Sequence, residues 1–171
     1  GASKATQYLI DNGHKKIAHV TGDLRKLSSQ ERLKAFKDTM EKNNLKVEDN
    51  YIINGDFTEE GGYKVLKEAL KDITPTAVFF ANDSMAIGGM KAISEMRLKI
   101  PEDISMIGFD DLPVAKYVTP ALTTIKISVN KLAKVALDNL MDIINENKKK
   151  EIYHNIEVEL IERGSVKTIE K

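Results

Sequence analysis

Short apolar runs alternate with segments of helical period along most of this chain. Six of these runs predict β-strands, because each is three to six residues long and is bounded by polar or turn-forming residues. The run Ala77–Ala81 is apolar at every position, which is typical of a strand covered on both faces of a parallel sheet. The predicted strands cover residues 17–20, 51–53, 77–81, 104–108, 124–127 and 156–161.

Between these runs, apolar residues recur every three or four positions, which predicts amphipathic helices. The longest stripe extends from Leu132 to Ile144. The early strands begin about 25 to 35 residues apart, a spacing typical of βαβ units, so we expect a doubly wound α/β fold around a parallel sheet. Residues that favour helix ends support the pattern: Ser29, Thr58 and Asn82 or Asp83 at starts, and Asn12-Gly13 at a stop.

Polar and aromatic residues follow the predicted strands at their carboxyl ends. In open parallel sheets this edge is where ligands bind. If the sheet is parallel, one rim therefore presents a guanidinium, an aromatic ring, an amide and a carboxylate. These candidate ligand-binding residues, in strand order, are Arg32, Phe57, Asn82 and Asp110.

Such a set suits an uncharged ligand rich in hydroxyl groups. Planar guanidinium and carboxylate groups pair with vicinal hydroxyls of a sugar, and an aromatic ring packs on its C–H face. The same groups can hold a nucleobase, and composition does not decide between the two. Each residue also has a purely structural interpretation: Arg32 as a helix-surface charge, Phe57 as core, Asn82 as a helix cap and Asp110 as a turn residue.

Composition excludes several classes of function. The 26 basic and 26 acidic residues give zero net charge, which argues against nucleic acid or an anionic membrane as the main partner of these residues. Cysteine is absent, so no thiolate chemistry or disulfide framework is available. No phosphate-binding loop or nucleophile motif is present, and the three histidines share no metal-ligand spacing. We therefore predict no enzyme, no cofactor and no metal site, and we interpret Lys148–Lys150 as a solvated loop.

Several motifs identify a family resemblance. The most specific stretch is Ile100–Asp111, with the sequence IPEDISMIGFDD, and further matching segments are residues 8–18, 29–36, 55–63, 75–88, 120–125 and 160–165. Together they cover nearly the whole chain and resemble the effector-binding part of bacterial LacI/GalR transcription regulators. At Ile127-Ser128 the sequence departs from the Gln-Pro that the family often has at a hinge-side ligand contact.

The resemblance implies a type I periplasmic-binding-protein-like fold with two α/β lobes and a ligand cleft between them. It also implies that the chain is a fragment, mainly the C-terminal lobe, without the DNA-binding head and most of the first lobe. Residues 15–127 would form the core of the second lobe, and residues 1–14 and 128–158 would pack on or return to the first lobe. Residues 159–171 would form a C-terminal strand and tail.

By position, Arg32, Phe57, Asn82 and Asp110 match the family's effector contacts. The implied function is effector sensing in a cytoplasmic, homodimeric repressor that binds a sugar or related metabolite and controls operator DNA binding allosterically through the missing head, with no membrane partner. Two alternatives stay open: an extracytoplasmic sugar-binding protein of a transport or sensing system, and an enzyme on the same scaffold. What precedes residue 1 in the gene would separate the first alternative from a regulator.

Overall fold

The computed structural model describes residues 1–146 and 154–169, which form an α/β body around one six-stranded sheet. The strand order is β2-β1-β3-β4-β5-β6. The first five strands are mutually parallel and β6 is antiparallel to β5, which confirms the predicted doubly wound parallel sheet. The strands are β1 (Ile17–Thr21), β2 (Ile52–Asn54), β3 (Ala77–Phe80), β4 (Ser105–Asp110), β5 (Thr123–Ile127) and β6 (Val158–Ile161).

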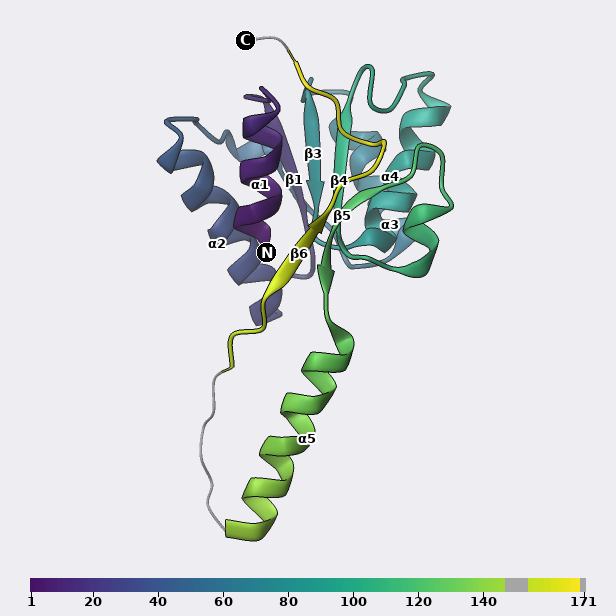
Figure 1. Ribbon diagram of the computed structural model, residues 1–171. Helices are drawn as coiled ribbons and strands as arrows, with labels where there is room; N and C mark the ends of the chain where they lie inside the picture. The colour runs from purple at the N-terminus through teal and green to yellow at the C-terminus, as the bar shows by residue number, and fades with distance from the viewer. Residues whose placement is uncertain (147–153, 170–171) are drawn as a thin grey trace.

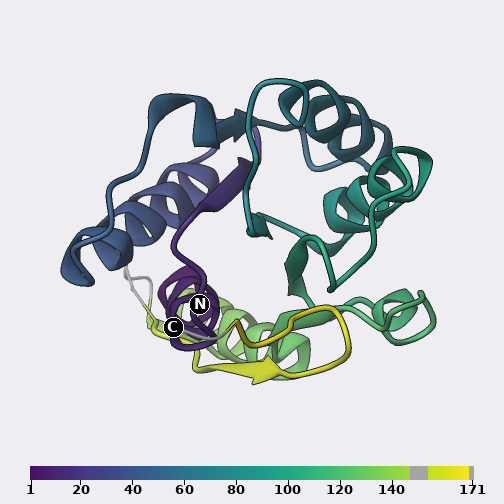
Figure 2. The same cartoon turned by 90° about the horizontal axis from the view of Figure 1, so that it is seen from above.

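Helices cover both faces of the sheet, as the uninterrupted apolar pattern of the third strand predicted. Figure 2 shows α1 (Ala2–Asp11) and α2 (Leu27–Lys42) on one side, and α3 (Glu59–Ala69) and α4 (Asp83–Glu95) on the other. Every residue of β1 and of β3 is buried as a result. Short 3-10 helices at Asp49–Tyr51 and Pro113–Lys116 complete the connections.

Most of the predicted helix ends are confirmed. The Thr58 hydroxyl accepts the Gly61 N–H at 2.9 Å, and the Asn82 side-chain oxygen accepts the Met85 N–H at 2.9 Å. The prediction for Ser29 was wrong: α2 begins at Leu27, and Ser29 lies fully buried in its first turn. The face of α2 that packs on the sheet includes Ser29, so its side chain points inward and does not cap the helix.

The segment 1–14, which we expected to contact a further lobe, contributes α1 to this body. Ala2, Ala5 and Leu9 are buried in the cluster that joins α1, α2 and the sheet. Gly13 follows with φ of +90°, a conformation that glycine adopts without strain, which agrees with the predicted stop at this point. The division of the chain between two lobes stays a prediction.

Helix α5 (Val129–Glu146) leaves the body at the end of β5 and projects away from it (Figure 1). Its apolar stripe lies on the surface, where Leu137 and Ile144 are 58% and 61% exposed. Lys148–Lys150 lie outside the described residues. Within residues 1–146 and 154–169, no helix combines the length and apolar character that a membrane span requires.

Candidate ligand-binding site

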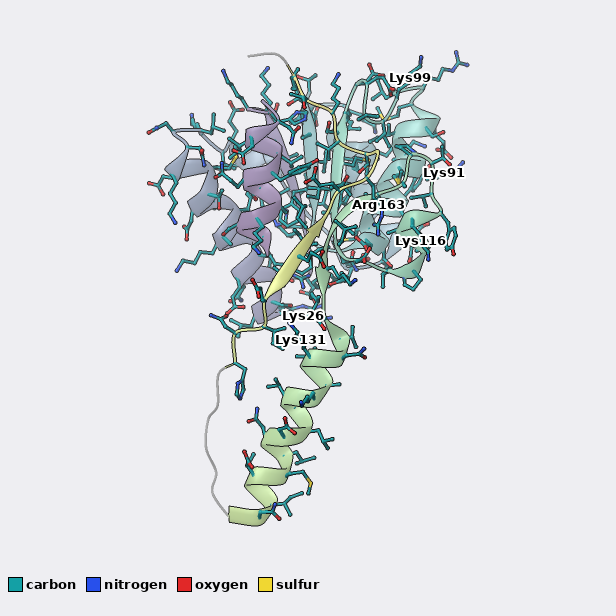
Figure 3. All side chains as sticks on the ribbon, viewed as in Figure 1. Lys26, Lys91, Lys99, Lys116, Lys131 and Arg163 are labelled. Atoms are coloured by element: carbon teal, nitrogen blue, oxygen red, sulfur yellow. The ribbon has the colours of Figure 1, made fainter. Side chains whose placement is uncertain are left out.

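The carboxyl ends of the parallel strands meet at the edge of the sheet from which α5 departs. Figure 1 shows β3 and β5 pointing toward this edge. In Figure 3, Lys26, just before α2, and Lys131, near the start of α5, lie at the same lower edge, whereas Lys99, before β4, lies at the opposite end. The segments that follow β1 to β5 therefore converge here, as the parallel topology predicted.

Three groups lie close to the guanidinium of Arg32 at this edge. Its Nη1 donates a hydrogen bond to the carbonyl of Ala81 at 2.5 Å, and its guanidinium lies 4.0 Å from the centre of the Phe109 ring. Its Nη2 lies 3.9 Å from a carboxylate oxygen of Asp110. Only 18% of the side chain is exposed, and burial lowers the pKa of Arg32 while Asp110 raises it. The guanidinium stays charged, because arginine is not deprotonated in proteins.

The gap between Arg32 and Asp110 matters chemically. A distance of 3.9 Å is too long for a direct hydrogen bond, so Nη2 and the carboxylate keep bonding capacity for a third group. Burial raises the pKa of Asp110, and the nearby Arg32 opposes that shift. The two groups thus form a donor and an acceptor, side by side and half-buried, at the edge where the sequence predicted them to meet.

Phe57 lies at the same edge of the sheet, in the loop that follows β2. Its φ of +71° is unusual for a residue with a side chain and places the ring over Gly22, where a Cβ would overlap the ring atoms. The Lys26 ammonium lies 5.2 Å from the ring centre. The ring is half-buried against the core formed with α3 and α4, which agrees with the structural interpretation, and its role in ligand binding stays a prediction.

Asn82 connects Phe57 to α4. Its Nδ2 donates to the carbonyl of Phe57 at 3.0 Å while its Oδ1 caps the helix through Met85. These bonds use one of the two amide hydrogens, and Asn82 is only 9% exposed. The structure therefore brings all four predicted residues to one edge in two pairs, Arg32 with Asp110 and Asn82 with Phe57.

Sequence reasoning missed three residues at this site. Phe109 supplies the ring under Arg32, although strand alternation places it on the opposite face from Asp110. Arg163 donates to a carboxylate oxygen of Asp111 at 2.5 Å and to the carbonyl of Leu122 at 2.7 Å. The third is Asp83, which the sequence offered only as a possible cap. No local pattern marks these partners, because each contact joins distant segments of the chain.

Two of the three histidines, His14 and His19, lie in the interior of this body. His19 is fully buried, its ring stacks on Phe79 with the centres 4.5 Å apart, and burial lowers its pKa to about 4. His14 lies between the hydroxyl of Thr76 and the carbonyl of Lys167. In the part of the chain that the structure describes, no group of three or more His, Cys, Asp or Glu side chains could hold a metal ion.

The fold agrees with that of known proteins. The family described as "Periplasmic binding protein-like domain" matches residues 6–166. The chain belongs to this family. Because the match covers almost the whole chain, the periplasmic-binding-protein-like fold predicted from the sequence is confirmed.

Named relatives within the family are repressors. The chain is 42% identical over 170 residues to the HTH-type transcriptional repressor PurR of Histophilus somni strain 2336, a match over 99% of this chain and 51% of the relative. It is 38% identical over 166 residues to the ribose operon repressor of Escherichia coli K12, covering 96% of this chain and 50% of the relative. The chain thus spans about half the length of the curated relatives it matches.

A solved structure gives the same result. The sugar-binding transcriptional regulator of the LacI family from Escherichia coli, complexed with phosphate, superposes with a TM-score of 0.89 at 31% identity, over 98% of this chain and 60% of that chain. The predicted resemblance to LacI-type regulators is confirmed by these relatives. Their names are those of transcriptional regulators and not of enzymes or transport proteins, so the extracytoplasmic alternative is not favoured.

Proposed function

We propose that this chain is the effector-sensing part of a LacI/GalR-type transcriptional regulator and binds a sugar-like or nucleobase-like ligand at the carboxyl edge of its sheet. The observation that carries the proposal is the juxtaposition of Arg32 and Asp110, which lie 3.9 Å apart with no hydrogen bond between them. Neighbouring hydroxyls of a sugar, or the polar edge of a base, can accept from the guanidinium and donate to the carboxylate together.

The surroundings support this ligand class. The half-buried Phe57 ring offers an apolar face for the C–H side of a sugar or for stacking of a base. The partial burial of Arg32 and Asp110 strengthens their hydrogen bonds relative to fully solvated groups. Both signs of charge are present, so the pair suits an uncharged ligand better than an anion.

The proposed mechanism is allosteric. A second lobe, supplied by the part of the protein outside this chain, would close over the edge and complete the ligand contacts. Effector binding would then favour one lobe arrangement and change the fit of a homodimer to operator DNA through a separate DNA-binding head, in the cytoplasm and without catalysis. Such regulation needs a coupling free energy of about 1–3 kcal/mol, a modest part of the roughly 8 kcal/mol of a micromolar complex.

A thermal-shift screen of sugars and nucleobases on the complete gene product tests the proposal. We expect one sugar or base to raise the melting temperature by mass action, and we expect the Arg32→Ala and Asp110→Ala variants to lose that shift. The exposed Lys99→Ala variant, at the opposite end of the sheet, serves as the matched control and should keep it. A ligand that stabilises the protein equally with Arg32 and Asp110 removed would refute this site.

A further inference from the structure

Asp83 is a buried carboxylate that the proposed ligand contacts do not use. It is the first residue of α4, but Asn82 caps that helix and the Asp83 side chain points into the interior. One carboxylate oxygen accepts the hydroxyl hydrogen of Thr124 on β5 at 2.5 Å. The other accepts the backbone N–H of Leu112 at 2.7 Å, so Asp83 ties α4 to two other segments.

Leu112 ends the segment that carries the ligand-site carboxylate. Asp110 and Asp111 both have positive φ, +112° and +57°, which residues with side chains rarely adopt. Two consecutive residues in this conformation persist only where the surroundings hold them. The Leu112 N–H is the first backbone donor after the pair, and its bond to Asp83 therefore fixes the point to which the chain must return after Asp110.

Two further features fit this arrangement. Gly108 on β4 leaves the space that the Asp83 carboxylate occupies, because a Cβ at that position would overlap one of its oxygens. Arg163, labelled in Figure 3, pairs with Asp111, and the side chains of both residues are less than a fifth exposed. The segment 110–112 is thus held by Asp83 at one end and by Arg163 in its middle.

We propose that Asp83 is a positioning residue of the ligand site, which places Asp110 beside Arg32 by holding the Leu112 N–H. The role in ligand binding rests on the function proposed above. The placement of Asp110 itself can be measured without any ligand, so the two ideas can fail separately.

The pKa of Asp83 depends on the charged groups and hydrogen bonds around it, and its titration can be followed in the test. The charged groups facing Asp83 are Asp110 and Asp111, while Arg32 from α2 pairs with Asp110 and Arg163 from the C-terminal segment pairs with Asp111. Burial raises the pKa of Asp83 to about 6, the Thr124 and Leu112 hydrogen bonds oppose this shift, and the two acidic neighbours add to it. The Leu112 amide should therefore report the titration of Asp83.

Two variants separate the charge of Asp83 from its hydrogen bonds. In Asp83→Asn, the amide oxygen can still accept from Leu112, and the Thr124 hydroxyl can turn to accept from the amide nitrogen. In Asp83→Ala, both bonds are lost. Both variants remove the same charge, so any difference between them reports position. Asp72→Asn, at an exposed aspartate, is the control for a charge change alone.

The decisive measurement is the pKa of the Asp110 carboxyl group, followed by carbon-13 NMR in this chain. In Asp83→Asn we expect the pKa of Asp110 to stay above its ordinary value, because the residue remains half-buried. In Asp83→Ala we expect it to fall toward the ordinary value as the segment opens to water. Equal pKa values of Asp110 in the two variants would overturn the proposal.

A second variant covers the case in which Asp83→Ala does not fold. Thr124→Val keeps the shape of the side chain and removes one donor to the carboxylate, so the pKa of Asp83 should rise further. The pH midpoint of the Leu112 amide shift should rise with it, and the shift should vanish in Asp83→Asn. If the pH dependence of the Leu112 amide shift is the same in Thr124→Val and Asp83→Asn as in the parent chain, Asp83 does not hold this segment.

Ligand binding then tests the functional consequence. With ribose or a free purine base as the probe, on the complete gene product, Asp83→Ala should weaken binding roughly tenfold or more and Asp83→Asn should restore most of it. Equal affinity in the two variants would overturn the positioning role. If neither probe nor any other sugar or base binds the unmodified protein, the proposed function fails, and the Asp110 comparison still decides the placement.

Discussion

At the residue scale, two buried titratable groups act in opposite directions on stability. The pKa of Asp83 is raised to about 6 from an ordinary value of 3.8, so its contribution to the free energy of unfolding is lost as pH rises from about 4 to 6. The pKa of His19 is lowered to about 4 from 6.5, so its contribution is lost as pH falls through the same range. We therefore expect these two effects to offset each other between pH 4 and 6.5.

A variant that removes one of these two groups should make the pH dependence caused by the other measurable. With Asp83→Asn, the free energy of unfolding should rise at pH 7 to 8 by about 2–3 kcal/mol, with the gain fading toward pH 4. The remaining His19 should then make that variant lose stability in acid. With His19→Phe, which keeps the stacking on Phe79, stability should instead increase as pH falls from 6 to 4. Urea unfolding from pH 4 to 8 measures both slopes, and identical slopes in the variants and the parent chain would contradict the assignment.

At the element scale, the apolar face of α5 is exposed rather than packed against the rest of the described structure. Its apolar side chains form one stripe, as the helical period predicted, and Leu137, Leu140 and Ile144 on it are each more than half exposed. Exposed apolar patches of this kind tend to associate. We expect this chain to dimerise or to exchange this helix between copies.

Sedimentation velocity over a range of concentrations tests that association. Leu137→Glu places a charge in the stripe and should shift the chain toward the monomer. Asn145→Glu adds the same charge at another exposed position of α5 and should leave association unchanged. A parent chain that stays monomeric at high concentration, with α5 helical, would show that the stripe is tolerated in water.

At the scale of the whole molecule, the Arg32 and Asp110 side chains stay partly exposed at the candidate site, by 18% and 33%. The four predicted residues lie at an edge of the body, and the relatives are about twice as long as this chain. We expect this chain alone to bind the effector weakly or not at all, because a second lobe would supply half of the contacts. Isothermal calorimetry with the ligand found for the complete gene product checks this, and micromolar binding to residues 1–171 would show that the edge suffices.

Much of this architecture could be predicted because it depends on local patterns. Apolar runs and helical stripes placed the strands and helices within a few residues, and Thr58 and Asn82 cap helices through bonds to residues three positions ahead. The convergence of Arg32, Phe57, Asn82 and Asp110 followed from parallel topology alone, since such a sheet brings every carboxyl end to one edge. Ser29 failed as a cap because burial of the helix face outweighed its local preference.

The amino-acid sequence by itself determined the order of elements, the doubly wound sheet and the edge at which the candidate residues gather. Only the tertiary structure decided what those residues touch: Arg32 on Ala81 and Phe109, Asp83 on Leu112 and Thr124, and Arg163 on Asp111. The physical reason is the range of the interactions. Periodicity and capping act over a few residues. The hydrogen bonds among these contacts join positions 29 to 52 apart in the chain, Arg32 and Phe109 are further apart still, and all of these contacts exist only after the sheet has brought the strands together.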